Sequence, residues 1–396
     1  MLMDAVQNQS QGPLDQRKSA RIAARGLHID PEVRRIATLD ESRALMRNAA
    51  ILQGGPGSDE VDVGNPEHVP VFYLDGDAHR QRRAAIARFF TPRAIQTRYR
   101  AIMEETTARL LAAMRAQGRA RLDRITFELT VAVAADIVGL TETTPTAMAP
   151  RLERLLRTAF SQARGLGKWR DRLLRAWYGY RFYRADVAPA IRKRRGQAGD
   201  DIISQCLAKG YSDKAILIEC MTYATAGMVT TREFIVMVAW HMFDNPALRE
   251  DFLGANEDRQ MAILLEILRI EPIAAVLYRT APEEMADARL GALCKGERLA
   301  VDLRAVHGDE RAVGACPHAI DPDRAAREGQ KGEFMSFGDG AHHCPGWQVA
   351  LHETRVFVDA LLRIPGIALE RAPDLGWNAG LMSYELRNAR VTCARG

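Results

Sequence analysis

One cysteine stands in a glycine-rich turn directly ahead of a helical pattern, and this arrangement constrains the fold more than any other stretch. The turn, residues 337–346, reads Phe-Gly-Asp-Gly-Ala-His-His-Cys-Pro-Gly. The residues after it place apolar side chains on one helical face: Val349, Val356, Phe357, Ala360 and Leu361. We therefore expect Cys344 at a helix N-terminus, where free N–H groups and the helix dipole favour a thiolate, and Pro345 at the first helical position. Such a charge-stabilised sulfur is a candidate metal ligand.

This turn resembles the haem-ligand loop of the cytochromes P450, which reads Phe-Gly-x-Gly-x-His-x-Cys-x-Gly. Every fixed place is filled in this chain, by Phe337, Gly338, Gly340, His342, Cys344 and Gly346. The resemblance implies haem b as the cofactor and Cys344 as the ligand to its iron. It also implies cofactor contacts by Phe337, Gly338, His342 and Gly346. Taken alone, the turn also fits a buried structural cysteine, or half of a zinc site through His342 and His343.

A second stretch, residues 74–83, is expected to form a helix that carries His79 and Arg83 four residues apart on one face. In the P450s a His and an Arg at these places bind the haem propionates. Arg279, on an expected strand, has the same role in the resemblance. With His342 these residues would neutralise two buried anions. Without the cysteine turn, His79 and Arg83 fit a solvated basic helix face equally well.

Two shorter matches support the resemblance because they fall in the order that the family has. Glu266 and Arg269 are three residues apart on an expected helix and are able to form an ion pair. Residues 321–324, Asp-Pro-Asp-Arg, lie in the family's meander ahead of the cysteine turn. The matches together extend over roughly residues 30 to 396.

A long helix is expected from about residue 214 to residue 244, with small side chains around Gly227 at its middle. A glycine within a helix costs about 1 kcal/mol relative to alanine, so it usually permits the close approach of another group. In the resemblance, Ala226 and Gly227 leave room for dioxygen and Thr230 hydrogen-bonds it. The alternative is a small-residue contact between packed helices.

Three residues depart from the family pattern. Val229 stands where an Asp or Glu usually moves protons toward the bound oxygen, so delivery would run through Thr230, water, Glu233 or the substrate itself. This departure favours oxidative coupling, in which the substrate supplies its own protons. Pro345 has no N–H to donate toward the sulfur. Leu351 stands where many bacterial members have an Arg that faces the redox partner.

Two segments are expected to cover a substrate pocket. Residues 53–70 are rich in turn formers and correspond to a loop that roofs the pocket. Residues 145–195 mix arginines with Trp and Tyr, which we interpret as two lid helices whose inner aromatics cover substrate. Stacking on nucleic acid or a plain amphipathic helix pair would also produce this pattern. The residues expected to line the pocket are Val69, Phe72, Met228, Val229, Ala274, Val276, Leu277, Leu381 and Met382.

Composition limits the remaining possibilities. The 396 residues are 47% hydrophobic and 27% charged with a net charge of +5, and the arginines are scattered, which argues against a dedicated nucleic-acid protein. The six cysteines form no Cys-x-x-Cys pair and are expected to be reduced. The first twenty residues lack an apolar run, and the most apolar segment, 216–243, is interrupted by charges. We expect a cytoplasmic protein without membrane contact, with a disordered arm at 1–20 and a single domain at 21–396.

The sequence as a whole predicts a mainly α fold with a small β region, the triangular helical prism of the soluble bacterial P450s around a buried haem. The predicted protein is a monomeric monooxygenase or oxidase that uses O2 and electrons from a separate ferredoxin and ferredoxin reductase. Its substrate would be a small organic molecule, as in secondary metabolism, and the outcome hydroxylation or C–C or C–N coupling. The alternatives are a non-catalytic haem-thiolate sensor or carrier and a peroxygenase driven by hydrogen peroxide.

Overall fold

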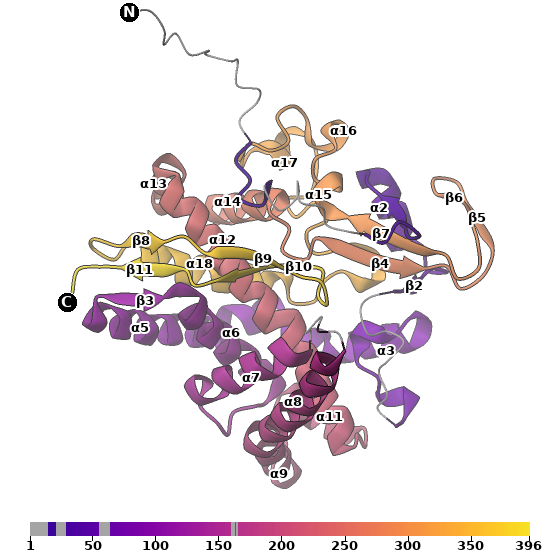
Figure 1. The fold of residues 1–396 in the computed structure, drawn as a ribbon, viewed down its shortest axis with the longest axis horizontal. Helices are drawn as coiled ribbons and strands as arrows, with labels where there is room; N and C mark the ends of the chain where they lie inside the picture. Colours follow the sequence, from indigo (N-terminus) through magenta and orange to yellow (C-terminus); the bar gives the residue numbers. More distant parts are fainter. Residues whose placement is uncertain (1–14, 21–28, 55–63, 160–162, 164) are drawn as a thin grey trace, which may run out of the picture.

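A computed structural model describes residues 15–20, 29–54, 64–159, 163 and 165–396 of the chain. These residues are mostly helical, with small sheets added to the helices (Figure 1), so the predicted fold class is confirmed. The longer helices are α2 (Leu39–Arg47), α3 (Gly76–Ile86), α5 (Arg100–Gln117), α6 (Leu122–Val138), α7 (Pro145–Ala159), α8 (Leu166–Phe182), α9 (Ala188–Gly196), α10 (Ile202–Ala208), α11 (Asp213–Tyr223), α12 (Thr230–Asp244), α13 (Pro246–Gly254), α14 (Glu257–Ile270) and α18 (Trp347–Leu362). Short helical turns are α4 (Pro92–Ala94), α15 (Leu303–Val306), α16 (Glu310–Val313) and α17 (Arg324–Arg327).

Helix α12 lies at the centre of the core, as Figure 1 shows by its course through the middle of the molecule. Residues 234–239 of α12 are at most 3% exposed, and a helix that is buried on all sides belongs inside a protein rather than on its surface. It packs against α6, α18 and strand β10 (Ser383–Arg387). Fully burying one large apolar side chain such as Phe357 of α18 contributes about 1.5–3 kcal/mol. These central helices therefore form the rigid frame that positions the cysteine turn.

The largest sheet brings distant segments together beside that turn. Its strand order is β1 (Arg34–Ile36), β7 (Arg298–Asp302), β4 (Val276–Thr280) and β2 (Leu52–Gln53). Strand β4 is antiparallel to β7, with Arg279 opposite Leu299. Because side chains alternate along a strand, Leu277 and Arg279 of β4 share one face, and Val276 lies on the other.

The remaining strands form small sheets near the C-terminus and at one edge. Strands β9 (Asp374–Asn378) and β10 form an antiparallel pair, and a bridge from Ala274 to Ser383 joins this pair to the segment before β4. The other strands are β3 (Arg119–Arg121), β8 (Ala368–Arg371) and β11 (Arg390–Thr392) in one sheet, and β5 (Met285–Asp287) and β6 (Gly291–Leu293) in another.

Capping side chains set where several of these helices begin. Ser212 accepts a hydrogen bond from the N–H of Ala215 at the start of α11, and Asn256 accepts one from Arg259 at the start of α14. A cap of this kind contributes about 1 kcal/mol. Asn245 caps α13, and Pro246 fits its first position because a first-turn N–H has no helical partner.

The end of the predicted disordered arm is in contact with the body of the protein. Residues 1–14 lie outside the described residues. Gln16 donates its N–H to the carbonyl of His318, the N–H groups of Lys18 and Ser19 bond Glu271, and Ser19 is buried. The prediction of disorder up to residue 20 is therefore wrong for residues 15–20, because a buried carboxylate 252 positions after Ser19 accepts hydrogen bonds that local composition does not reveal. In the described part of the chain, no helix is both long enough and apolar enough to span a bilayer.

Candidate active site

The cysteine turn has the close backbone geometry that its glycines predict. Gly338 and Gly340 have φ of +73° and +67°, which residues with a Cβ rarely adopt. The N–H of Cys344 donates to the carbonyl of Phe337 at 2.9 Å, which closes the turn. Helix α18 begins at Trp347 with Gly346 as its N-cap, so Pro345 precedes the helix rather than opening it as predicted.

Cys344 is partly exposed, and its sulfur is a free thiol. Burial of the sulfur raises the pKa of Cys344, and the N–H of Gly346 and the charge of Arg83 only partly oppose this effect. Burial therefore opposes the thiolate that the N–H groups at this place favour. A thiolate at this place needs a bound cation, which is the chemistry of a metal ligand.

The middle of the long helix opens into free space. The predicted helix from 214 to 244 is continuous, but its centre, Ala224–Val229, is a π-helix (η6) between α11 and α12. Such segments are frequent at functional sites. Ala226 is exposed although it lies within the core region, and a Cβ added at Gly227 would meet no atom within 4 Å. Thr230 is partly exposed on the same stretch, and its hydroxyl donates to the carbonyl of Ala226 at 2.6 Å.

Two histidines predicted from separate stretches lie together. The rings of His79 on α3 and His342 in the cysteine turn are 4.1 Å apart. His342 Nε2 lies 3.0 Å from Asp75 Oδ1, the residue just before α3. His79 is 3% exposed, and burial lowers its pKa to about 4, with the charges of His342 and Arg83 acting in the same direction.

Two arginines from distant segments are desolvated beside these rings. Arg83 donates to the carbonyl of His343, and Arg279 donates to Gln53 and to the carbonyl of Tyr278. Arg279 is only 5% exposed, and burial lowers its pKa to about 10. The hydrogen-bond acceptors of both guanidinium groups are neutral oxygens. A buried cation held this way favours an incoming anion.

These residues fit haem b. A sulfur that becomes a thiolate by binding a cation suits the iron, and the buried Arg279 and the half-buried Arg83 suit two carboxylates. At Gly227, nothing lies within 4 Å of the position of a Cβ, which suits the close approach of a ligand. Asp75 and Gln53 were missed by the sequence analysis as partners of His342 and Arg279. Asp75 was visible only as an acidic residue at the start of a helix, and Gln53 had no local signal.

Comparison with known proteins agrees with this site. A family model for cytochrome P450 matches residues 260–364. Cytochrome P450(MEG) from Priestia megaterium is 24% identical over 388 residues, which cover 91% of this chain and 88% of the relative. Nocardicin C N-oxygenase from Nocardia uniformis subsp. tsuyamanensis is 24% identical over 358 residues, which cover 87% and 83%. The crystal structure of CalO2 superposes with a TM-score of 0.76 and 21% identity over 92% of this chain and 91% of that one.

The chain belongs to the cytochrome P450 superfamily. This P450 is an oxidoreductase of the monooxygenase class, and its cofactor is haem b, bound through a cysteine thiolate. The matched residues 260–364 include the cysteine turn and the ion pair of Glu266 and Arg269, in which Arg269 Nη2 lies 2.7 Å from Glu266 Oε1. Arg324 of the predicted meander joins the pair at 3.0 Å from the same oxygen.

Glu233 does not belong to the open face of this P450. It is fully buried, and its Oε1 accepts hydrogen bonds from Arg232 and Arg387. Its Oε2 accepts the N–H of Leu386 at 2.8 Å. The prediction that Glu233 delivers protons is therefore wrong, because a carboxylate held by two arginines and a backbone donor serves to join α12 to β10.

Met228 and Val229 also turn away from the open face. They are 0% and 6% exposed in the main core, and the carbonyl of Met228 accepts the hydroxyl of Thr130 on α6 at 2.9 Å. Both residues were predicted to line the substrate pocket, and this is wrong. The helix presents Ala226, Gly227 and Thr230 to the open side, so the residues between them must face α6.

The pocket residues on strand β4 and in the turn after β9 divide into two groups. Leu277 is partly exposed, and its Cδ1 lies 3.8 Å from the Cβ position of Gly338 in the cysteine turn. Val276 and Met382 are buried together in a separate small cluster, so their predicted place in the pocket is wrong. Strand β4 alternates its side chains and turns Val276 away from Leu277, and Met382, in the turn before β10, packs in the same cluster as Val276. Val69, Phe72, Ala274 and Leu381 are partly exposed or exposed, as pocket residues require.

The lid and the redox face differ from expectation as well. Trp169 and Trp177 of α8 are 65% and 55% exposed and point to solvent, whereas Phe182 is buried and Tyr178 packs against the main core. Helix α8 packs its other side on α7. Residues 55–63 of the predicted roof lie outside the described residues.

Leu351 is 3% exposed and belongs to the core, so it does not occupy a surface position that faces a partner.

Proposed function

We propose that this P450 oxidises a small organic molecule of the secondary-metabolite kind, using O2 and electrons from a separate acidic ferredoxin and its reductase. The relative named nocardicin C N-oxygenase supports this class of substrate. The single observation that carries the proposal is the open face of η6, where Ala226 is exposed and Gly227 faces free space. The same chain presents a partly exposed Cys344 as the candidate haem ligand.

Haem b held by a thiolate supplies the activation of dioxygen when it is bound. The chain's own residues would then divide the remaining tasks. Cys344 would hold the iron, and Arg83, Arg279, His79 and His342 would hold the propionates. The Thr230 hydroxyl, which now donates to the carbonyl of Ala226, can turn to donate to a ligand on the open face.

Substrate contacts are proposed for the partly exposed or exposed apolar residues near this region: Val69, Phe72, Ala274, Leu277 and Leu381. Because Val229 is buried and carries no proton, a substrate that brings its own O–H or N–H protons is favoured. This argument supports oxidative C–C or C–N coupling over simple hydroxylation as the outcome.

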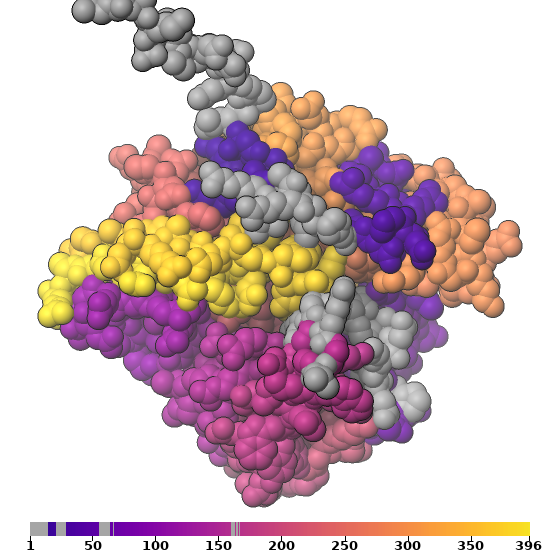
Figure 2. Space-filling model, in the orientation of Figure 1, coloured from indigo at the N-terminus to yellow at the C-terminus, as the bar shows by residue number. Residues whose placement is uncertain are grey.

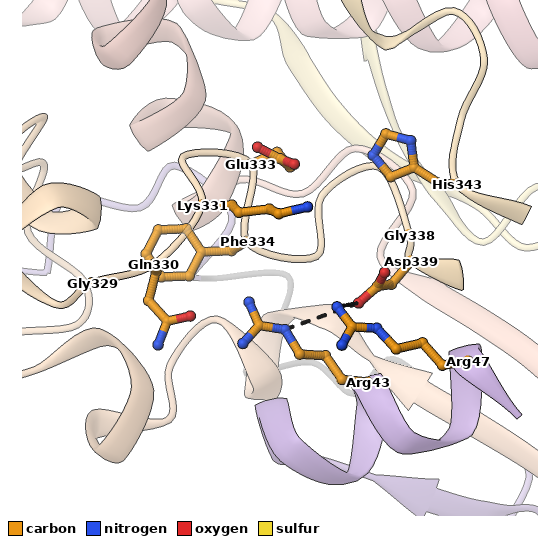
Figure 3. A pocket seen from close by; sticks show the side chains of 10 residues that line it. All are labelled: Arg43, Arg47, Gly329, Gln330, Lys331, Glu333, Phe334, Gly338, Asp339 and His343. Atoms are coloured by element: carbon orange, nitrogen blue, oxygen red, sulfur yellow. Dashed lines mark ion pairs between the residues drawn. The ribbon is translucent and has the colours of Figure 1, made fainter. Parts of the chain in front are cut away.

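A pocket beside the cysteine turn supports docking of an acidic electron donor. Its volume is about 220 Å³, and it lies between α2, the loop at 329–334 and the turn itself. Figure 3 shows Arg43 and Arg47 of α2 and Lys331 pointing into it, with Asp339 opposite. Arg47 bonds Asp339 at 2.8 Å, while Arg43 is 4.0 Å away from it and its Nε has no hydrogen-bond partner in the described structure.

The experiment that tests the proposed function uses haem-loaded protein. Reduced protein with carbon monoxide is expected to show the red-shifted band of thiolate-bound haem, and Cys344→Ser is expected to lose it. Candidate metabolites are then incubated with a surrogate ferredoxin, its reductase and NADPH. Product that requires these proteins supports the proposal, product with hydrogen peroxide alone favours the peroxygenase, and ligand binding without product favours the sensor. Persistence of the band in Cys344→Ser would refute the haem ligand.

Charge reversal tests the electron-donor surface separately. Lys331→Glu is expected to raise the KM for ferredoxin about tenfold at low salt, with a smaller difference at high salt, because screening weakens exposed charge pairs. Arg311→Glu is the matched control, since Arg311 is an exposed cation outside the pocket. Equal effects of both variants would exclude this pocket as the docking site.

A further inference from the structure

A group of buried polar atoms lies between α3 and α11, apart from the residues assigned so far. Arg82 of α3 is 4% exposed and Glu219 of α11 is 1% exposed. Arg82 Nη2 and Glu219 Oε1 are 3.4 Å apart, which is too long for a good hydrogen bond. In the described structure, the atoms of this group without a hydrogen-bond partner are Arg82 Nε and Nη1, both carboxylate oxygens of Glu219, and Tyr223 Oη.

Such an arrangement is costly if it stays dry. A buried polar atom without a partner costs about 1–3 kcal/mol. Proteins satisfy most buried polar groups with other protein groups or with ordered water, and a buried water typically makes two to four hydrogen bonds. The facing atoms of Arg82, Glu219 and Tyr223 supply both donors and acceptors. We therefore expect this group to hold ordered water.

The group reaches the surface through the segment before α3. The guanidinium of Arg82 lies 4.6 Å above the ring of Tyr211, and the ring of His68 stacks on Tyr211 at 4.0 Å. Tyr211 donates its hydroxyl to the carbonyl of Glu67 at 3.2 Å, and Glu67 is exposed. One end of the polar group is therefore next to solvent.

The other end reaches the open helix face. Tyr223 is the last residue of α11, and Gly227 follows four positions later, in η6. Residues four positions apart lie beside each other on one face of a helix, so the Tyr223 side chain lies on the side of the helix that carries Gly227. This spacing places the Tyr223 end of the polar group next to the open face of η6.

We propose that Arg82, Glu219 and Tyr223 hold ordered water and relay protons from solvent to the open face of η6. This inference rests on the proposed oxidase function, and it supplies the route that Val229 cannot provide. Glu219 passes its proton through water to the Tyr223 hydroxyl, and Glu219 is reprotonated from the solvent side. As the Tyr223 hydroxyl accepts this proton, it releases its own proton toward the open face of η6. Each side chain returns to its starting state, and one proton enters for each that leaves.

The first test does not depend on turnover. The relay requires Glu219 to carry a proton, so its carboxyl is expected to give the infrared carbonyl band of a protonated acid in haem-loaded protein. Burial raises the pKa of Glu219 and favours this state, and the charge of Arg82 acts in the opposite direction. This band is expected to shift promptly in D2O, because a hydrated site exchanges with solvent, and to vanish in Glu219→Gln. Glu353→Gln is the matched control, since Glu353 is a buried carboxyl on α18 whose pKa burial raises to about 8.

The second test follows protons during turnover in variants that keep the thiolate–carbon monoxide band, which separates a failure of the relay from a failure of the proposed function. Glu219→Gln and Tyr223→Phe are expected to lower the product formed per NADPH about tenfold and to raise the solvent isotope effect, as loss of a positioned proton donor does. If Glu219→Gln does not fold, Tyr223→Phe, which keeps the aromatic ring, still tests the relay. The relay is refuted if the Glu219 band is missing or does not exchange, if both variants stay within twofold of the parent, or if Glu353→Gln has the same effect.

Discussion

Replacing Glu266 with Gln is expected to destabilise this P450 strongly, because one carboxylate is the ion-pair partner of two buried arginines. Glu266 is 4% exposed, and Arg269 and Arg324 are each 1% exposed. The carboxylate accepts from Arg269 at 2.7 and 2.8 Å, from Arg324 at 3.0 Å and from the N–H of Asp321 at 3.1 Å. Gln keeps the shape but removes the charge and one acceptor.

The size of the effect follows from the cost of unpaired buried charge. Breaking a buried ion pair by removing one partner costs about 3–5 kcal/mol. Unfolding entropy near the melting temperature is about 2.1 cal/mol/K per residue, which for a chain of 396 residues is about 0.8 kcal/mol/K. A loss of about 4 kcal/mol therefore corresponds to a fall in Tm of about 5 °C.

The assay is thermal unfolding of haem-loaded protein followed by circular dichroism, with haem retention measured in parallel. Arg324 also bonds the carbonyls of Val313 and Ala315, so the network anchors the segment that leads to the cysteine turn, and haem loss should accompany unfolding. Glu104→Gln is the control, since Glu104 forms a partly exposed helical pair with Arg100 worth about 0.3–0.5 kcal/mol. A Tm change for Glu266→Gln no larger than that of the control would contradict the reasoning.

Three further outcomes are expected. Thr230→Val should lower the product formed per NADPH several-fold. Thr225→Val is the control, because it removes the same kind of hydroxyl bond to a carbonyl four residues earlier in the same helix, and it should leave this ratio unchanged. Similar losses in both variants would deny Thr230 a special role. Pro345→Leu should raise the haem reduction potential in spectroelectrochemistry, because a restored N–H can withdraw charge from the sulfur, and an unchanged or lower potential would count against this. Burial lowers the pKa of His307 to about 3 in the folded protein. Between pH 6.5 and pH 3 the unfolded chain therefore carries a proton on His307 that the folded protein does not. The free energy of unfolding falls as the pH drops through this range, by about 2 kcal/mol at pH 5. His307→Asn should flatten this acid limb in pH-dependent denaturation, and an unchanged limb would show that other groups cause it.

Local spacing along the chain determined the ligand turn and the helix carrying Gly227, and the motifs at these places carried the resemblance that implied the fold class. A turn with glycines at positive φ needs only neighbouring residues, and i, i+4 neighbours such as His79 and Arg83 follow from the helical repeat. The same is true of the pair formed by Glu266 and Arg269. These features were predictable because their geometry depends on covalent connection and helix period.

The direction of each side chain at the site was decided by tertiary structure. Glu233 is taken up by Arg387, 154 positions away, and Leu351 is covered by the core. Val276 and Met382 meet in a separate cluster, and Glu219 meets Arg82 across two helices. A sequence states which groups can be charged or apolar, but the partner that each group finds depends on which distant segments pack against it. That packing is a property of the whole core, and no local spacing encodes it.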